Sequence, residues 1–282
     1  MWPPPGSGFW TAETDVLTVL ALYLACGAAA GFLAGLLGIG GGLVVVPLLT
    51  LIFSVQAVMS PDVAMHAAVA TSLSCILFTA VSSARAHARR GSVSWHYVRG
   101  LAPGIVAGTL LGSFGARHVS GFGLRAFFVV FLLCVATQML LDLYPKASGR
   151  NPGTPALAGA GLLIGGVSSL VGLGGGSLTV PFLRWSGVEL HKAVGTSSAV
   201  GWFIAAAGTV GFVLSGWGDP RLPAWSLGYI NVPATFGIAC TSVFFAPLGA
   251  RLSHALPVSS LRKVFAVFLY LTAANMIWGM IR

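Results

Sequence analysis

The sequence predicts an all-α integral membrane protein of about ten segments, arranged as an inverted repeat of five plus five. Hydrophobic residues make up 56% of the 282-residue chain and charged residues only 7%. Long apolar runs recur along the whole chain and the few charges lie between them, a pattern typical of membrane-spanning helices. The third observation is a glycine-rich segment that occurs once in each half.

The two halves repeat each other in order. Residues 36–49 read LLGIGGGLVVVPLL and residues 170–183 read LVGLGGGSLTVPFL, identical at eight of fourteen positions. Further pairs are HAAVATSLS (66–74) with HKAVGTSSA (191–199), Gly-Ala-Arg (115–117) with the same triplet (249–251), and FFVVFLLCVATQM (127–139) with VFAVFLYLTAANM (264–276). Two homologous halves, each with a glycine-broken apolar segment, indicate a secondary transporter.

Ten apolar segments can be read along the chain. They are 16–37, 43–58, 66–84, 100–116, 124–144, 155–171, 177–188, 191–214, 225–250 and 261–280. The second and seventh are short for a span of about 20 residues, and both begin just after a triple glycine. We therefore expect two short helices, one in each half.

The distribution of Lys and Arg favours five crossings in each half. With five crossings, eleven of the fifteen basic residues share one side and only Arg117, Arg125, Arg221 and Arg282 lie opposite. If each glycine segment turned back instead, the division would be eight to seven. The positive-inside rule favours the first arrangement and makes the larger set cytoplasmic. The prediction is a first repeat over 1–144 with an outside tail at 1–15, a cytoplasmic linker at 145–155, and an inverted second repeat over 156–282, with both termini outside.

The triple glycines are the predicted binding site. Each break exposes backbone N–H groups, and the helix that follows adds the positive end of its dipole. In an inverted repeat the two breaks can meet near the midplane and form an anion site without formal charge. The predicted substrate-binding residues here are Gly40, Gly41, Gly42, Gly174, Gly175, Gly176 and Ser177. The alternative is that the glycines only let helices pack closely.

Hydroxyl and amide side chains occur in symmetric pairs. Thr71 and Ser72 in the first half match Thr196, Ser197 and Ser198 in the second, and we expect them to line the substrate path. Gln138 and Asn275 match in the last segment of each half, and they are further candidates for substrate contact. Interhelical hydrogen bonding is the alternative for both sets.

Histidines begin two matching segments near opposite faces. His66 and His191 are candidates for gating or proton relay, and Lys192 is a candidate for attracting anions on the cytoplasmic side. Helix capping or a position in the membrane interface is the alternative for the histidines. Lys192 has no basic counterpart, because Ala67 stands in its place.

Several function classes are disfavoured. The deep interior lacks a carboxylate for cation binding or coupling, and no basic face interleaved with aromatics supports nucleic-acid binding. We expect no metal, no cofactor and no catalytic residue. The four cysteines lie inside apolar runs without a CxxC pair. An intramembrane protease is disfavoured because no G-x-S-G occurs. A non-transporting assembly factor is the other alternative from a different class.

The chain resembles the TauE/SafE family of sulfite exporters. The resemblance rests on the doubled G-x-G-G-G-x-x-x-V-P-x-L, the following H-x-A-V-x-T-S, the basic loop ARAHARRGSVSW (84–95) and the late G-A-R. It implies export of sulfite or a small organosulfur anion across the bacterial inner membrane. The second half has no basic counterpart to that loop around residues 215–223.

The function expected from residues and resemblance together is export of a small anion by alternating access. A passive anion channel and an uptake permease for a sulfur oxyanion are the alternatives within transport. The expected partners are the anion and the lipid bilayer. The sequence leaves the oligomeric state open, a homo-oligomer included, and it leaves ion coupling undecided.

Overall fold

The apolar segments fold into helices close to the predicted positions. The computed structural model describes residues 12–37, 41–56, 59–141, 152–253 and 258–281. Its helices there are α1 (Ala12–Leu37), α2 (Gly42–Gln56), α3 (Pro61–Arg89), α4 (Trp95–Ala116), α5 (Gly121–Leu140), α6 (Thr154–Val171), α7 (Gly176–Trp185), α8 (Leu190–Ser215), α9 (Val232–Ser253) and α10 (Val258–Ile281). Strands β1 (Ser226–Leu227) and β2 (Ile230–Asn231) form a small antiparallel hairpin. The all-α fold class is confirmed.

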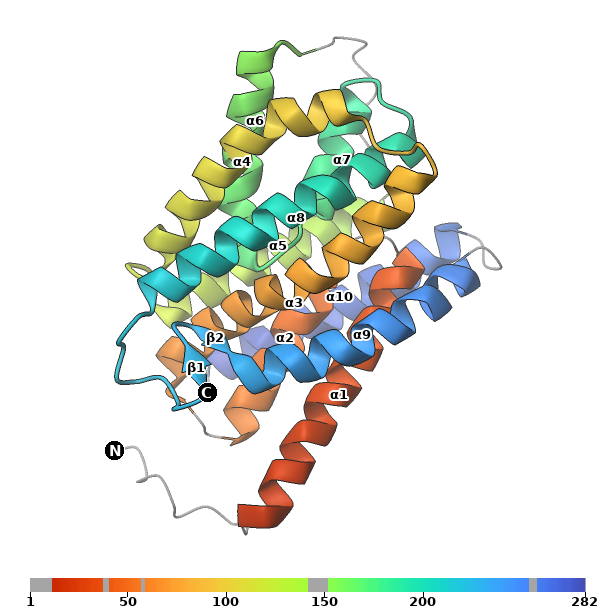
Figure 1. Ribbon diagram of the computed structural model, residues 1–282. Coiled ribbons are helices and arrows are strands. Elements are labelled where there is room, and N and C mark those ends of the chain that lie inside the picture. The colour runs from red at the N-terminus through yellow and green to blue at the C-terminus, as the bar shows by residue number, and fades with distance from the viewer. Residues whose placement is uncertain (1–11, 38–40, 57–58, 142–151, 254–257, 282) are drawn as a thin grey trace.

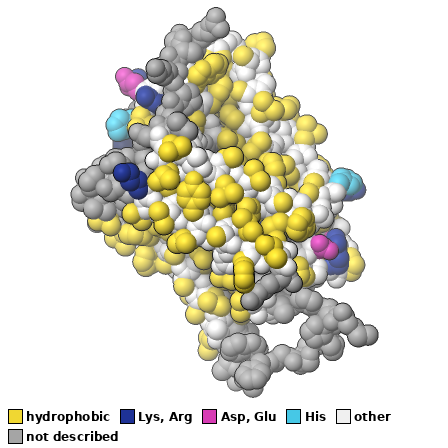
Figure 2. Space-filling model, turned by 180° about the vertical axis from the view of Figure 1, so that it is seen from behind, with side chains coloured by type: hydrophobic (Ala, Val, Ile, Leu, Met, Phe, Trp, Pro, Cys, Tyr) yellow, Lys and Arg dark blue, Asp and Glu magenta, His cyan; other side chains and the backbone are white. Residues whose placement is uncertain are grey.

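The surface is that of a protein surrounded by lipid. Seven of the described helices are long and apolar enough to cross a membrane. Large hydrophobic side chains are exposed along most helices, as Leu163, Phe244 and Leu271 illustrate. Figure 2 shows that on this face hydrophobic side chains cover the flank and charged ones gather at two opposite ends. Water-soluble proteins rarely expose an apolar surface of this extent, and contact with lipid explains it.

Helix starts follow ordinary capping chemistry. Ser120 precedes α5, and its hydroxyl accepts a hydrogen bond from the Gly123 N–H at 3.1 Å. Asn231 precedes α9, and its side-chain oxygen accepts from the Ala234 N–H at 3.0 Å. Pro61 occupies the first turn of α3, where the missing N–H costs nothing. These caps fix where three helices begin at one face of the molecule.

The two longest inner helices, α3 and α8, form the centre of the molecule. They pack against each other. In Figure 1 the α4–α6 pair lies above them and the α1–α9 pair below. Helices α5 and α10 form a third pair. The short helices α2 and α7 pack against α3 and α8 respectively, so the two helices that follow the glycine runs are held against the centre.

The helix pairs map onto each other when the halves are exchanged. Exchanging equivalent helices turns the α1–α9 pair into the α6–α4 pair, and it leaves the α3–α8 and α5–α10 pairs unchanged. A two-fold relation between the halves produces this pattern. It supports the inverted repeat, which remains a prediction.

The helix ends divide between two faces. Gly121 at the start of α5 packs on Asp62 at the start of α3. Arg125 of α5 donates to the Gly279 carbonyl of α10 at 3.3 Å, so α10 ends at this face too. Helix α8 begins at the other face, beside the loop between α3 and α4, because the Ser94 N–H donates to Thr196. This alternation is what five crossings in each half would produce.

A row of glycines brings α4 against α6. Gly104 and Gly108 of α4 lie so close to α6 that an added Cβ would overlap the carbonyls of Ala158 and Leu162. Gly161 and Gly165 make the reciprocal approach to α4. Small residues at four-residue spacing allow this backbone contact in membranes. Packing alone therefore explains these glycines.

Gly108→Ala is expected to destabilise the protein by about 1–3 kcal/mol, because the new methyl group overpacks the α4–α6 contact. Gly159→Ala in α6 is the matched control, since nothing lies within 4 Å of its added Cβ. We expect that change to be neutral or slightly stabilising. Thermal unfolding of the two purified variants in detergent checks this, and equal melting temperatures would contradict the packing assignment.

Candidate anion site at the two glycine breaks

The second break is a sharp interruption between α6 and α7. Gly172 ends α6 with φ of 72° and Gly175 precedes α7 with φ of 78°, values that favour glycine over residues with a side chain. The N–H groups of Leu178 and Thr179 bond to the Gly175 carbonyl at 3.1 and 2.7 Å. The first N–H groups of α7, at Gly176 and Ser177, have no partner within their own helix.

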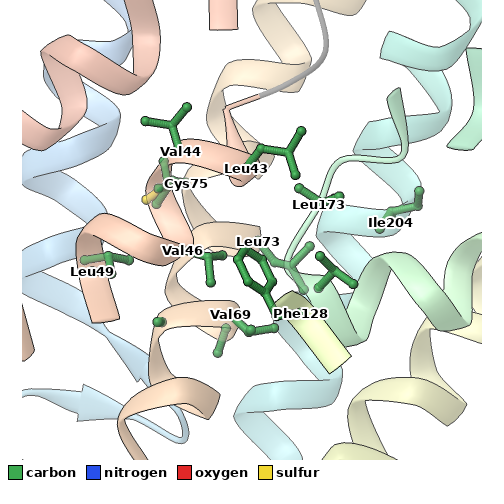
Figure 3. Close-up of a cluster of buried hydrophobic side chains, with 14 of the residues drawn as sticks. Leu43, Val44, Val46, Leu49, Val69, Leu73, Cys75, Phe128, Leu173 and Ile204 are labelled. Carbon is green, nitrogen blue, oxygen red and sulfur yellow. The ribbon is translucent and has the colours of Figure 1, made fainter. Parts of the chain in front are cut away.

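The start of α2 touches the second break. An added Cβ on Gly42, the first residue of α2, would overlap the Gly172 carbonyl and lie 2.8 Å from Leu173 Cδ2. Figure 3 shows Leu43 and Leu173 side by side at this contact. The Ser72 hydroxyl of α3 donates to the same Gly172 carbonyl at 2.9 Å. Residues 38–40, which include the predicted Gly40, lie outside the described residues.

The contact lies near the middle of the central helices. An added Cβ on Gly174 would lie 3.0 Å from Cγ2 of Ile76, near the midpoint of α3. Gly201, near the midpoint of α8, approaches the Gly174 carbonyl. The breaks therefore lie about equally far from both faces of the bundle.

Hydroxyl groups without partners surround the start of α7. The Ser177 Oγ and Thr179 Oγ1 atoms are buried and have no hydrogen-bond partner among the described residues. Thr179 is fully buried, and its Oγ1 would lie 3.2 Å from a Cβ added to Gly175. A buried hydroxyl without a partner costs free energy. A bound anion would supply the missing acceptor and would also receive the N–H groups of the first turn.

Comparison with known proteins identifies the family. Residues 23–276 match the sequence pattern of the family described as "Sulfite exporter TauE/SafE". The chain belongs to this family. It is 40% identical to a probable membrane transporter protein of Haemophilus influenzae, over 93% of this chain and 99% of that one. A probable membrane transporter protein of Methanocaldococcus jannaschii is 25% identical over 91% of this chain and 95% of its own. No solved structure matches.

In this TauE/SafE protein, two of the predicted hydroxyls cap helices of the opposite half. Thr71 of α3 accepts from the Asn231 N–H just before α9, at 3.0 Å. Its equivalent Thr196 of α8 accepts from the Ser94 N–H just before α4, at 2.9 Å. Both threonines are fully buried. Their hydroxyls join the two halves, and substrate contact through them remains a prediction.

The other predicted hydroxyls divide between the break and their own helix. Ser72 reaches the second break, as described above. Ser197 and Ser198 both donate to the Val194 carbonyl, at 2.8 and 3.1 Å. Ser198 also receives a hydrogen bond from Ser83 of α3 at 3.2 Å.

The predicted amide pair lies on the α5–α10 pair of helices. The Asn275 side chain is exposed and that of Gln138 is half-buried. No contact between either amide and the breaks occurs among the described residues. A neighbouring hydroxyl of α5, that of Thr137, bonds to the Tyr270 hydroxyl of α10 at 2.7 Å. The breaks and the amide pair are therefore separate features of the fold.

The predicted histidines have different environments. His66 is buried at the start of α3, where its ring faces main-chain carbonyls. His191 is exposed at the start of α8. Lys192 is exposed as well and lies 3.8 Å from the Glu189 carboxylate, which offsets its charge. A shared gating role for the two histidines remains a prediction, and the two faces of the protein are chemically unequal.

Proposed function

We propose that this TauE/SafE protein exports a small anion, sulfite or a small organosulfonate, by alternating access between its two halves. The observation that carries the proposal is the contact of the two glycine breaks beside the unpartnered hydroxyls of Ser177 and Thr179. An anion there would accept hydrogen bonds from these hydroxyls and from the first N–H groups of α7. The family and the names of its relatives support membrane transport. The substrate class rests on the site chemistry and the family description.

The interior favours an anion over a cation. Among the residues that the structure describes, His66 is the only buried Asp, Glu, Lys, Arg or His. A transporter for cations usually holds an acidic side chain within its spans. The groups available at the breaks are N–H and O–H donors, which suit a negatively charged oxygen.

Export follows from the expected orientation and the membrane potential. With the larger basic set in the cytoplasm, the protein is a multi-pass protein of the bacterial inner membrane with both termini outside. A potential that is negative inside expels an anion with about 2.3 kcal/mol per charge per 100 mV. This potential can drive export without an ion gradient, and proton coupling through a histidine is the alternative. The two halves, whose equivalent helices exchange, can rock against each other about the breaks.

The proposal is tested by flux of radiolabelled sulfite from proteoliposomes. We expect the rate of efflux to saturate with the sulfite concentration and to rise when the potential is negative inside. We also expect counterflow. Sulfoacetate and thiosulfate as competitors then rank the substrates. Large single-channel currents without counterflow would identify a passive channel, and the absence of any sulfur-oxyanion flux from folded protein would contradict the proposed substrate class.

Thr71→Val and Thr196→Val separate capping from substrate binding. Each change leaves an N–H without its acceptor, buried at Asn231 and partly buried at Ser94, so we expect destabilisation by about 1–3 kcal/mol, with the larger effect for Thr71→Val. If the threonines act only as caps, the KM for sulfite stays at the wild-type value in the folded fraction. Melting temperature and flux measured on the same preparations check this. A rise in KM with unchanged melting temperature would instead assign them to the substrate path.

A further inference from the structure

A cavity lies at the face where α3 and α5 begin and α4 ends. Its volume is about 300 Å³, and its polar lining consists mainly of Asp62, His66, Arg117, His118, Arg221 and Tyr229. We call it the His66 pocket. These residues come from both halves of the chain, since Arg221 and Tyr229 lie between α8 and α9. The positive-inside rule places this face outside. Arg117 and Arg221 of the pocket are two of the four basic residues expected on that side.

Main-chain carbonyls surround the ring of His66 on both sides. Its Nδ1 lies 2.9 Å from the Asp62 carbonyl oxygen, and its Nε2 lies 2.9 Å from that of Ala116 and 3.1 Å from that of Val119. Tyr229 stacks on the ring at 5.4 Å between centroids. These contacts hold the ring in place as part of the wall of the pocket.

Arg117 is the basic residue of the pocket that is free to bind a ligand. The Arg221 guanidinium bonds the Asp219 carboxylate at 2.6 Å and holds the pKa of that carboxyl below its usual value. This pair is therefore neutral as a unit. Asp62 is exposed and forms no ion pair with Arg117. The Arg117 guanidinium has no hydrogen bond or ion pair among the described residues, so its N–H donors are available.

The pocket is aligned with the glycine breaks. His66 precedes Ser72 by six residues on α3, which corresponds to about 9 Å along a helix. Ser72 is the residue that bonds the Gly172 carbonyl in the second break. A solute leaving the breaks along α3 toward this face would reach the His66 pocket.

We propose that the His66 pocket binds a small oxyanion, a sulfonate or sulfate-like group, through the Arg117 guanidinium. Its position as the outer station of the transport route rests on the proposed function. Its ability to bind an oxyanion does not, because the pocket is lined by residues outside the breaks.

The first experiment measures sulfate binding to the full-length protein in nanodiscs of neutral lipid. Sulfate is a suitable probe because its charge is constant from mildly acidic to mildly alkaline pH. Arg117→Gln is expected to weaken binding about tenfold, since a charge-assisted hydrogen bond is lost. Arg99→Gln is the matched control, because Arg99 is an exposed arginine at the opposite end of α4. It should leave the affinity unchanged.

Two further measurements separate the sources of the oxyanion and the two sites. Anionic lipid in the nanodisc abolishes sulfate binding if a lipid phosphate headgroup occupies the pocket, and this would assign the site to that headgroup. Gly42→Ala is expected to close the central site. If sulfate still binds to this variant in a way that depends on Arg117, the pocket is established independently of transport. Equal sulfate affinity of wild type and Arg117→Gln in neutral lipid, with no difference in retention of anionic lipid, would overturn the proposal.

Discussion

Gly42→Ala is expected to reduce sulfite flux by about 100-fold, the scale on which a displacement of about 1 Å disables a preorganised site. The added methyl group would overlap the Gly172 carbonyl and press on Leu173. The two breaks must then separate, and the hydrogen-bond donors no longer converge. Proteoliposome flux, normalised to folded and inserted protein, measures the effect.

Two glycine variants serve as controls for Gly42→Ala. An added Cβ on Gly159 of α6 meets nothing within 4 Å, so Gly159→Ala should transport at a rate close to wild type. Gly31→Ala overlaps the Ser242 backbone of α9, away from the breaks. It should lower the melting temperature and keep the flux per folded molecule. Wild-type flux through folded Gly42→Ala would remove the breaks from the transport site.

Thr179→Val is expected to raise the KM for sulfite about tenfold or more, without destabilising the protein. Its buried hydroxyl has no partner in the empty site, so its removal relieves an unsatisfied group. A hydrogen bond to a charged acceptor is lost when the anion is bound. Ser177→Ala should act in the same direction. Melting temperature and flux are measured together on each variant.

Thr50→Val in α2 is the converse control. The Thr50 hydroxyl is buried too, but it donates to the Val46 carbonyl at 2.8 Å. Its loss should lower stability by about 1 kcal/mol and leave the KM unchanged. A KM for Thr179→Val equal to that of wild type, with a raised melting temperature, would assign Thr179 to packing alone.

The sequence predicted the fold through local signals. Long apolar runs define the helices, and three adjacent glycines in an apolar run predict an interruption that the structure contains at residues 172–175. Both short helices begin at the last glycine of their run, one residue earlier than expected. Gly100, Gly104, Gly108 and Gly112 are spaced four residues apart, which is a further local signal for close helix packing. The structure contains this contact between α4 and α6. The internal repeat alone does not predict it.

Features that depend on distant residues could not be predicted in this way. Thr71 and Thr196 are matched in sequence, but their cap partners lie 160 and 102 residues away. Thr179 is one of several threonines in apolar surroundings, and only packing shows that it has no partner. The His66 pocket combines residues from both halves, for which no short motif exists.

Equilibrium binding of radiolabelled sulfite to the purified protein in nanodiscs of neutral lipid tests the central claim most directly. Arg117→Gln serves as the background, so that the His66 pocket contributes little. The account predicts one saturable site that is lost in Gly42→Ala and retained in Gly159→Ala. Equal binding by the two folded glycine variants would contradict an anion site formed by the two breaks.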